Sequence, residues 1–451
     1  MKISAQKTKL SGNITVPGSK SHTIRALILA SMAEGTSHIA NPLPSNDCLS
    51  TAAAIKQVGA KVDLTSKENT WIVEGAGKNL HLPEDKIDVG NSGSLMYFLC
   101  PVLSTLSGEC TFTGDESICT RPVGHLIDAL NQFGAKAECL PNPTGKPLCP
   151  PFKFCGPIDV SKELNTDGKL SQYISGFMMA ATKLNGTLHM NLATPKETPY
   201  LTMTKLWLES VGVNCRISDD FKTVEVDGPV NIKAFDKAVP SDWEGVAFPL
   251  IAALITDSKI VINNIDGSGS QGDDKIVEVL QKAGADIVWD KKACTLTVTG
   301  GKRLSGNLTI NISDFPDAIC ALAVIACFIE GTTTFTDVEI CRKKETDRIW
   351  AMRTELSKLG AVLEEGDDCL IVHGHSPLLE NGQANPEFVI HGGEVESYKD
   401  HRIVMSLACL GLALKDNEKL IVKDAEWCSV TFPHFFEVMN TIGAGFIEIE
   451  K

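Results

Sequence analysis

Apolar and polar positions along this chain form a two-part pattern that occurs six times. In the first part, an apolar run of helical length ends in a polar turn and is followed by a stretch typical of a β-strand. The six runs are ILASMAEGTSHI, PVLSTLSGECTF, FMMAATKLNGTLHM, PLIAALITDSKIVI, AVIACFIEGTTTF and SLACLGLALKDNEKLIV. Their helical portions are nearly apolar all round, which is typical of helices buried on every face.

In the second part, an amphipathic helix closes on a glycine and leads into another strand. The closing glycines lie 75, 78, 72, 76 and 83 residues apart and are Gly59, Gly134, Gly212, Gly284, Gly360 and Gly443. We expect them to lie at helix C-caps, where a left-handed backbone favours glycine. The same is expected of the first-part glycines Gly35, Gly108, Gly186 and Gly331. A repeat of this length indicates six copies of one unit, most simply βαβαββ.

Six units divide naturally into three plus three, and a length of 451 residues also favours two or more domains. Parallel strands within a unit need the helices as right-handed crossovers. Three units could then pack their helices inward and their sheets outward. The best boundary between the halves lies near Val226–Ala238, after the third unit. The predicted fold class is α/β, with six βαβαββ repeats in two groups of three.

Composition and charge exclude several classes of function. The longest apolar run, Ala318–Ile329, is too short for a membrane span, which takes about 20 residues. The N-terminal stretch MKISAQKTKLSG lacks the apolar segment of a signal peptide. A formal net charge of −14 disfavours nucleic acid and anionic membranes as partners. The 15 cysteines are scattered and never spaced C-x-x-C, so we expect reduced thiols in a cytoplasmic protein.

Polar residues interrupt the pattern where helices are predicted to begin. Serine, asparagine and aspartate at such positions would serve as ordinary N-caps. Caps do not explain the cations, because the helix dipole disfavours positive charge at this end. The cations at or near helix starts are Lys20, Arg25, Arg121, Lys344, Arg348 and Arg402. Their placement in several units predicts a bound polyanion, since helix N-termini also attract anions.

Three further side chains lie among these cations in the sequence. Asp317, Glu345 and His401 could act as general acid or base, or as ion-pair partners of the cations. His373 and His375 alternate on a probable strand without a third ligand nearby, so we expect no metal site there. The GSGSQGDD stretch lacks the glycine spacing of a nucleotide-binding loop and is interpreted as a turn before a helix.

These motifs, in this order, resemble those of the enolpyruvyl transferases, and in particular the branch that acts on shikimate 3-phosphate. The resemblance covers nearly the whole chain through PGSKSHTIRALILASMAEGTS, GNSG, TRPVGHLIDAL, SQYISGFMMAA, PYLTMT, DFPDA, KKETDRIWAM and DHRIVMSLA. It implies a two-lobed inverse α/β barrel with three repeats in each lobe. Residues 14–228 would form the first lobe, and residues 1–13 with 229–451 the second.

The resemblance implies addition and elimination without a metal or organic cofactor. The methylene of phosphoenolpyruvate is protonated, a ring hydroxyl attacks its central carbon, and phosphate leaves. Asp317 would take the proton of the acceptor hydroxyl, and Glu345 and Lys20 would handle protons on the pyruvyl side, with His401 nearby. The partners implied are small anionic substrates, and we expect a monomer that binds neither nucleic acid nor membrane.

The resemblance also implies the groups that hold each substrate. Phosphoenolpyruvate would be bound by Lys20, Gly93, Arg121, Gln172, Arg348 and Arg402. The cyclic acceptor would be held by Ser21, Arg25, Ser171, Tyr200 and Lys344, and Asn91 of the GNSG motif also belongs to the expected substrate site.

Five positions depart from the family pattern. Tyr97 and Val430 stand where the family usually has arginine and lysine, and Ile340 stands where it usually has asparagine. Leu170 and Glu197 stand where serines usually hold the acceptor's phosphate.

The last two departures leave the acceptor open. An acid at residue 197 would repel a phosphate dianion if it lay in the pocket, whereas the ordinary alternative is a Glu197 that faces solvent. Lys169 could partly compensate. Three functions are therefore open: transfer to shikimate 3-phosphate, transfer to a different cyclic alcohol, for example an unphosphorylated one, and anion binding without catalysis. Retention of all four of Asp317, Glu345, Lys20 and Arg402 argues against the third.

Overall fold

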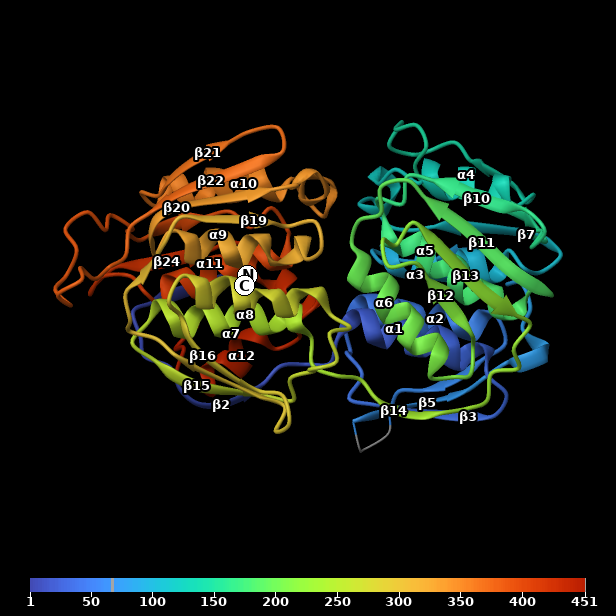
Figure 1. Cartoon of the computed structure of the whole chain (residues 1–451), viewed down its shortest axis with the longest axis horizontal. Coiled ribbons are helices and arrows are strands. Elements are labelled where there is room, and N and C mark those ends of the chain that lie inside the picture. Colours follow the sequence, from blue (N-terminus) through green and yellow to red (C-terminus); the bar gives the residue numbers. More distant parts are fainter. Residues whose placement is uncertain (66–68, 451) are drawn as a thin grey trace. The chain divides into compact units, whose positions relative to one another are not determined.

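The chain forms two compact units in a computed structural model that describes residues 1–65 and 69–450. Unit 1 comprises Met1–Pro17 and Ser241–Lys451, and unit 2 comprises Gly18–Pro240 (Figure 1). Each unit has a hydrophobic core of its own. No helix in the described part of the chain combines the length and apolar character needed to cross a bilayer.

Unit 2 contains three four-stranded sheets, one for each repeat. Their strand orders are β14-β3-β5-β4, β6-β7-β9-β8 and β10-β11-β13-β12, and only the first pair in each sheet is parallel. The strands are β3 (Thr36–Ala40), β4 (Lys61–Asp63), β5 (Thr70–Glu74), β6 (Ile87–Asp88), β7 (Gly108–Thr113), β8 (Lys136–Cys139), β9 (Phe152–Gly156), β10 (Glu163–Thr166), β11 (Gly186–Leu192), β12 (Cys215–Ile217), β13 (Thr223–Gly228) and β14 (Asp236–Ala238).

Unit 1 repeats this arrangement in the orders β2-β15-β17-β16, β19-β20-β22-β21 and β23-β24-β1-β25, with β18 also beside β20. The strands are β1 (Lys2–Gln6), β2 (Ser11–Thr15), β15 (Lys259–Asn263), β16 (Asp286–Asp290), β17 (Thr295–Thr299), β18 (Leu304–Ser305), β19 (Leu308–Asn311), β20 (Ile329–Thr336), β21 (Val362–Glu365), β22 (Cys369–Gly374), β23 (Gly393–Val395), β24 (Lys419–Val422) and β25 (Ile447–Glu450). The predicted sixfold βαβαββ repeat is confirmed.

Two helices belong to each repeat. Those of unit 2 are α1 (Lys20–Met32), α2 (Asn46–Gln57), α3 (Gly93–Leu103), α4 (Gly124–Gln132), α5 (Ser171–Ala180) and α6 (Thr198–Glu209). Those of unit 1 are α7 (Trp243–Ile255), α8 (Lys275–Lys282), α9 (Ile319–Ala326), α10 (Arg348–Lys358), α11 (His401–Gly411) and α12 (Phe435–Asn440). Short 3₁₀ turns are η1 (Gly77–Asn79), η2 (Ile118–Thr120), η3 (Ala181–Lys183), η4 (Gly272–Asp274), η5 (Pro316–Ala318), η6 (Glu339–Lys343) and η7 (Ala425–Val430).

The first helix of each repeat is buried, as its all-apolar composition predicts. Every residue of α3, α7, α9 and α11 is buried. In unit 1 α7, α9 and α11 pack on one another inside the sheets, and in unit 2 α3 packs between α1 and α5 (Figure 1). The starts of these central helices therefore come close together within each unit.

The structure moves both boundaries that the sequence predicted between the halves. Strand β2 pairs with β15 of unit 1, so residues 14–17 belong with unit 1 and not with the first lobe. Strand β14 pairs with β3 of unit 2, so residues 229–240 belong with unit 2. The expected link at Val226–Ala238 thus contains paired strand residues.

The predicted glycine caps are right for one part of the pattern only. Gly59, Gly134, Gly284 and Gly360 follow a helix C-cap directly with φ between 89° and 108°, as predicted. The first-part glycines instead lie at the following strand: Gly108 and Gly186 are the first residues of β7 and β11, Gly35 directly precedes β3, and Gly331 is the third residue of β20. Their positive φ serves the entry into the strand, which the sequence pattern did not distinguish from a cap.

Candidate active site

The starts of α10 and α11 and the turn η5 bring together three predicted residues of unit 1. Asp347 caps α10 by accepting from the N–H of Ile349 and Trp350, and Asp400 caps α11 by accepting from the N–H of Arg402 at 2.9 Å. These caps set Arg348 and Arg402 in the first turns of their helices. Asp317 in η5 reaches both guanidinium groups.

Asp317 is surrounded by three cations. Its Oδ1 accepts a hydrogen bond from Arg348 Nη1 and lies 3.2 Å from Arg402 Nε, and its Oδ2 lies 3.5 Å from Lys344 Nζ. The side chain keeps 14% of its surface exposed, whereas those of Arg348 and Arg402 are buried. This carboxylate is thus accessible and held in one orientation.

Arg348 is fixed by three carboxylates. Its Nε lies 2.7 Å from Asp400 Oδ2 and its Nη2 lies 2.6 Å from Glu345 Oε2, in addition to the contact with Asp317. Burial lowers the pKa of Arg348, but Asp400, Glu345 and Asp317 outweigh burial, so the pKa is raised. Burial raises the pKa of Asp400 while Arg348 opposes that rise. The guanidinium therefore stays charged.

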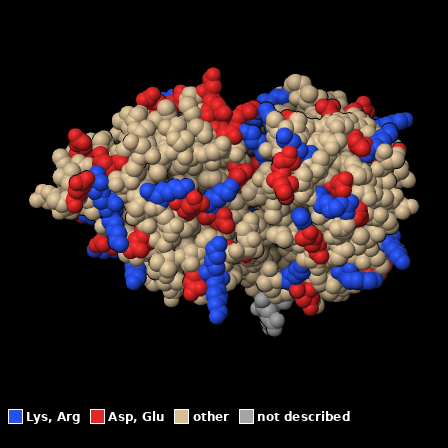
Figure 2. All heavy atoms as spheres, viewed as in Figure 1, with Lys and Arg blue, Asp and Glu red and all other residues tan. Residues whose placement is uncertain are grey.

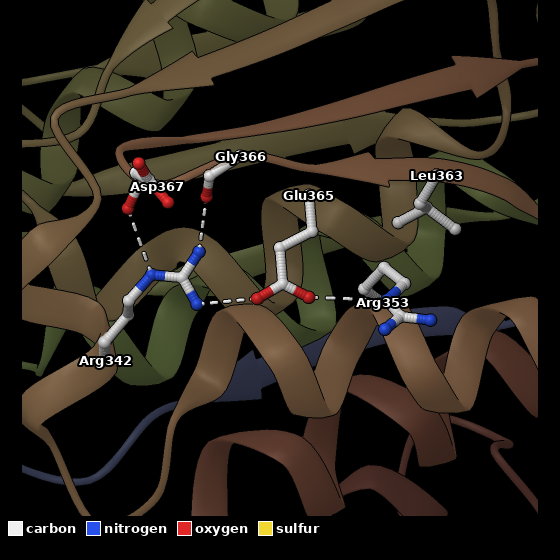
Figure 3. Close-up of a pocket in the computed structure, with 6 residues that line it drawn as sticks. All are labelled: Arg342, Arg353, Leu363, Glu365, Gly366 and Asp367. Atoms are coloured by element: carbon white, nitrogen blue, oxygen red, sulfur yellow. Dashed lines mark hydrogen bonds and ion pairs between the residues drawn. The ribbon is translucent and has the colours of Figure 1, made fainter.

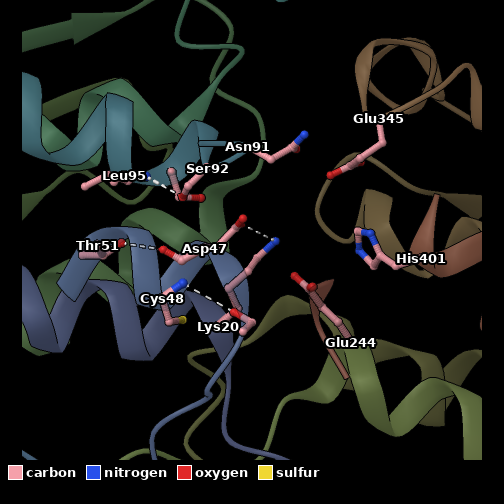
Figure 4. Close-up of polar contacts among 12 residues, drawn as sticks. Lys20, Asp47, Cys48, Thr51, Asn91, Ser92, Leu95, Glu244, Glu345 and His401 are labelled. Atoms are coloured by element: carbon pink, nitrogen blue, oxygen red, sulfur yellow. Dashed lines mark hydrogen bonds and ion pairs between the residues drawn. The ribbon is translucent and has the colours of Figure 1, made fainter. Parts of the chain in front are cut away.

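His401 begins α11 and is buried, with Nδ1 4.0 Å from Asp400 Oδ1. The side chains of His401, Glu345 and Glu244 come from three different elements of unit 1 (Figure 4). The structure therefore gathers Asp317, Lys344, Glu345, Arg348 and Arg402 at the helix starts of unit 1, with His401 beside Asp400.

In unit 2 the predicted cations also lie at helix starts. The Lys20 amine, at the first residue of α1, points to the Asp47 carboxylate of α2 and lies 3.5 Å from its Oδ2 (Figure 4). Arg121 Nη2 donates to Asn91 Oδ1 at 2.9 Å, just before α3. Gly93 lies beside the Arg121 guanidinium, since a Cβ at this position would be in ordinary van der Waals contact with Arg121 Nη1 at 3.5 Å.

Polar side chains link the starts of α3 and α5. Gln172 Nε2 donates to Ser94 Oγ at 3.0 Å, which ties the first turn of α5 to that of α3. The predicted residues Asn91, Gly93, Arg121 and Gln172 are thus neighbours at one end of unit 2.

Arg25 is placed differently from a surface cation. Its guanidinium is buried, donates to Thr204 Oγ1 at 2.8 Å and to the Ser21 carbonyl at 3.0 Å, and lies 4.6 Å over the ring of Phe98. Another donor reaches the Tyr200 carbonyl at 3.3 Å. Burial lowers the pKa of Arg25 to about 9, so it remains protonated near neutral pH. In the structure Arg25 ties α1 to α6, and its contact with an acceptor stays a prediction.

The side chain of Glu197 reaches the start of α5 and does not face solvent. Its side chain is buried, and Oε2 accepts from the backbone N–H of Ser171 at 3.1 Å and from Ser171 Oγ at 3.0 Å. Glu197 itself precedes α6 with a left-handed φ of 53°. The solvent-facing alternative is therefore wrong. A carboxylate occupies the helix N-terminus that Ser171 and Leu170 introduce.

The other departures from the family pattern have packing roles in the structure. Tyr97 donates its hydroxyl to the Pro122 carbonyl at 3.2 Å, and its ring lies 5.3 Å from that of His125. Ile340 packs partly buried against the core of unit 1. Val430 is half-buried at the end of η7.

A pocket of about 520 Å³ lies elsewhere in unit 1, against β21 and α10 (Figure 3). Arg342 and Arg353 line it together with Leu363, Glu365, Gly366 and Asp367. Arg342 donates to Glu365 Oε1 at 2.7 Å and to the Gly366 carbonyl at 2.6 Å, so Glu365 compensates its positive charge. On the face drawn in Figure 2, basic and acidic side chains are interspersed in the same way.

The HGH histidines have neighbours that sequence spacing did not predict. His375 Nδ1 lies 3.3 Å from Glu330 Oε1 and 3.7 Å from Glu387 Oε2, and these three atoms lie within 4.8 Å of one another. The expectation of no third ligand nearby was therefore wrong, because the carboxylates come from distant stretches of chain. Glu330 also accepts from the Ser376 N–H and Asn385 Nδ2, which anchors the loop after β22.

Comparison with known proteins identifies the family. Residues 4–439 match the family profile described as EPSP synthase (3-phosphoshikimate 1-carboxyvinyltransferase). This chain belongs to the EPSP synthase family. Members of the family are transferases, and the expected enolpyruvyl transferase resemblance is confirmed.

Relatives and solved structures agree with this assignment over the whole length. A 3-phosphoshikimate 1-carboxyvinyltransferase of Ruminiclostridium cellulolyticum is 34% identical over 449 residues and is covered completely, as is this chain. One of Methanococcus aeolicus is 35% identical over 450 residues, covering 98% of this chain and 99% of that protein. A structure of EPSP synthase from Acinetobacter baumannii matches with a TM-score of 0.82 at 25% identity, covering both chains completely.

Two site features of unit 1 were not predicted from the sequence. Asp400 was noticed only as a residue of the DHR motif, yet it holds both Arg348 and the start of α11. Glu244 lies in the SDWEG stretch at the start of an apolar helix, and its contact with Arg402 could not be predicted from that position. The available signal was an aspartate or glutamate at the start of an apolar helix. The sequence did not show which cation of unit 1 each carboxylate contacts.

Proposed function

We propose that this chain transfers the enolpyruvyl group of phosphoenolpyruvate to a ring hydroxyl of shikimate 3-phosphate and releases phosphate. The family and the names of its relatives support this reaction. The structural observation that carries it is the Asp317 carboxylate, accessible yet held among Lys344, Arg348 and Arg402 at helix starts. Such a site suits anionic reactants that must also exchange protons.

The unit 1 residues would supply charge neutralisation and proton transfer. Arg348 and Arg402 bind the anionic groups of phosphoenolpyruvate, since guanidinium donors match carboxylate and phosphate geometry. Glu345 donates the proton that adds to the methylene carbon, and it later accepts the proton that leaves the resulting methyl group. Asp317 accepts the hydroxyl proton as the acceptor oxygen bonds to the central carbon. Phosphate then departs as the carbon–carbon double bond forms again.

The unit 2 residues would hold the rest of the two substrates. Lys20, Arg121 and Gln172 contribute donors to phosphoenolpyruvate, and Ser171, Tyr200 and Arg25 position the acceptor. Preorganised cations at fixed helix starts stabilise charge that builds up in the transition state without having to reorganise. We further propose a cytoplasmic monomer whose partners are these small anionic substrates.

The test is a conservative change at the proposed phosphoenolpyruvate site. Arg402→Lys keeps the charge but removes the fork of donors, so the KM for phosphoenolpyruvate should rise at least about tenfold. The matched control is Arg342→Lys in the separate pocket, which should leave that KM within about a few-fold of wild type. An unchanged KM in Arg402→Lys would contradict the assignment of Arg402 to the phosphoenolpyruvate site.

A second candidate function is transfer to an unphosphorylated cyclic alcohol, and Glu197 favours it. A phosphate placed at the Ser171 N–H would meet this buried carboxylate, with a repulsion of about 4 kcal/mol per pair of unit charges at about 4 Å and an effective dielectric of about 20. Glu197→Ser, alone or with Leu170→Ser, should then raise catalytic efficiency with shikimate 3-phosphate relative to shikimate at least about tenfold. An unchanged ratio in the folded double variant leaves the phosphorylated acceptor as the substrate.

A further inference from the structure

Glu244, in the first turn of α7, contacts the guanidinium that the proposed function assigns to phosphoenolpyruvate. Its Oε2 accepts a hydrogen bond from Arg402 Nη2, and the two side chains are 8% and 2% exposed. Asp242 caps α7 by accepting from the N–H of Glu244 at 3.3 Å, which fixes this turn of the helix. The contact between Glu244 and Arg402 is therefore built into the packing of α7 against α11.

Arg402 nevertheless has buried donor atoms without a hydrogen-bond partner in the described part of the chain. Within residues 1–65 and 69–450, no hydrogen-bond partner reaches its buried Nη1 atom. A buried guanidinium donor without a partner is costly, because it has lost water without gaining a bond. Glu244 accepts from Nη2, whereas Nε, which lies 3.2 Å from Asp317 Oδ1, and Nη1 have no hydrogen-bond acceptor among the described residues, so these two donors are left for an incoming anion.

The charges around Arg402 oppose such an anion. Four carboxylates come from the elements packed here: Asp242 and Glu244 of α7, Asp273 of η4 and Asp317 of η5. Two guanidinium groups, those of Arg402 and Arg348, face them. Burial raises the pKa of Asp273, and the nearby carboxylates of Glu244 and Asp317 raise it further. The carboxylates already paired with these cations, Glu244 with Arg402 and Asp317 with Arg348 and Lys344, therefore compete with a substrate anion that enters.

We propose that Glu244 is a built-in competitor for the anion site: its carboxylate occupies Arg402 until phosphoenolpyruvate displaces it. The cost of breaking this buried contact weakens substrate binding, because the substrate must replace an anion that is already paired. Glu244 thus sets the affinity of the site for phosphoenolpyruvate while Arg402 supplies the attraction. This role rests on the proposed assignment of Arg402 to that substrate.

The test separates a competitor from a structural support. Glu244→Gln keeps the size and a hydrogen-bonding side chain but removes the charge, so the KM for phosphoenolpyruvate should fall at least about tenfold, or about 1.4 kcal/mol. The matched control is Glu278→Gln on α8, where the exposed carboxylate pairs with Lys282 at 2.9 Å. That control removes the same charge from unit 1 and should leave the KM within about a few-fold of wild type.

A second variant keeps the proposal testable if the first does not fold. Glu244→Ser also removes the charge and suits the first turn of a helix, so it should lower the KM in the same direction. A KM that is unchanged or raised in a folded variant overturns the proposal, because Glu244 would then hold Arg402 in place for the substrate. Arg402→Lys distinguishes the two claims: if it leaves the KM unchanged, the assignment of Arg402 fails, whereas an effect there with none at Glu244 overturns this inference alone.

Discussion

Asp317 is the residue from which the proposed chemistry is most directly testable. Asp317→Asn keeps the shape of the side chain but cannot accept the hydroxyl proton, so turnover should fall by about two to four orders of magnitude. Substrate KM values should change by only about a few-fold, because the guanidinium donors remain. Steady-state kinetics with both substrates measures this split.

The matched control for Asp317 lies three residues earlier. Asp314 pairs with Lys275 at 2.6 Å on the surface, and Asp314→Asn should leave turnover near that of wild type. A turnover within a few-fold of wild type in Asp317→Asn would make Asp317 an ion-pair partner of Arg348 and Arg402 and nothing more.

His125 links pH to the stability of unit 2. Burial lowers the pKa of His125 to about 4, and the ring lies 4.9 Å from that of Tyr173. The unfolded chain takes up a proton near pH 6.5, whereas the folded chain resists it until about pH 4. Stability should therefore be full above about pH 6.5 and fall as the pH drops towards about 4, by up to about 3 kcal/mol.

Denaturant unfolding at several pH values measures the effect of His125. His125→Gln should flatten this part of the pH dependence, because the substituted side chain does not titrate. His434→Gln is the control, since that imidazole is 78% exposed. Equal slopes for wild type and His125→Gln between about pH 4 and pH 6.5 would contradict the assignment.

Single residues were predictable where the repeat itself fixes their place. Asp317 and Arg402 lie at the starts of the first helices α9 and α11 of two successive repeats, and Arg348 begins the second helix α10, so the repeat placed all three at helix starts of unit 1. Glu197 and Arg25 were not predictable, because their burial depends on contacts between separate elements. The Glu197 carboxylate meets the start of α5, and the Arg25 guanidinium of α1 meets Thr204 of α6.

At the scale of elements, a glycine at or directly after the end of the last strand of the repeat in chain order (β5, β9, β13, β17 and β22) recurs in five of the repeats. It lies against a helix end, so that an added Cβ would lie about 2 Å from a backbone carbonyl oxygen. The five glycines are Gly75, Gly156, Gly228, Gly300 and Gly374. The close approach lets each sheet reach the end of its buried helix.

Gly300→Ala should therefore destabilise unit 1 strongly. The new Cβ would lie 1.9 Å from the Ala253 oxygen and 2.1 Å from the Thr256 oxygen, so α7 and β17 must separate. We expect a loss of about 3 kcal/mol or more, which is typical of overpacking against rigid backbone. Thermal or denaturant unfolding measures the loss.

Gly284→Ala in the same repeat is the control for backbone conformation. Its φ is 89°, but the nearest atom to an added Cβ is 3.9 Å away. This change should cost only about 1 to 2 kcal/mol, from the left-handed backbone alone. If Gly300→Ala proved no more harmful than Gly284→Ala, the close approach would not limit the packing.

Element types were predictable because apolar helices and strands alternate six times. The glycines at the ends of the last strands were not predicted, since the need for glycine comes from a carbonyl oxygen of another element and not from a local sequence pattern. The first-part glycines were misassigned as caps because a positive φ serves a strand entry equally well.

At the scale of the whole molecule, the two cores share no residue. The core of unit 2 lies within residues 24–239, and that of unit 1 comes from residues 3–16 and 243–446. Strand β14 closes the first sheet of unit 2 by pairing Asp236 with His38 and Ala238 with Ala40. Residues 18–240 should therefore fold alone with one cooperative unfolding transition.

Residues 14–228 are the matched control, because they follow the boundary predicted from the sequence. This piece lacks β14 and the buried side chains of Ile232 and Val239, which should cost about 3 kcal/mol or more. Circular dichroism and denaturant unfolding compare the two pieces. Equal stability would mean that β14 is not needed to complete unit 2.

The number of repeats was predictable from the period, but the exchange of strands was not. Strands β1 and β2 complete unit 1, although the chain then builds all of unit 2 before it returns. The pairs between β14 and β3 are 198 positions apart and those between β15 and β2 are 248 apart. Such distant pairing leaves no local sequence signal, which is why both boundaries were placed too early.

The reaction itself is the most direct test of the proposed function. The full-length protein is mixed with phosphoenolpyruvate and either shikimate 3-phosphate, shikimate or a related cyclic alcohol, and released phosphate and the product mass are measured together. We predict phosphate release matched one to one by an enolpyruvyl ether of shikimate 3-phosphate, at least about tenfold more efficient than with any other acceptor. Release with an unphosphorylated alcohol alone, or with no acceptor at all, would contradict it.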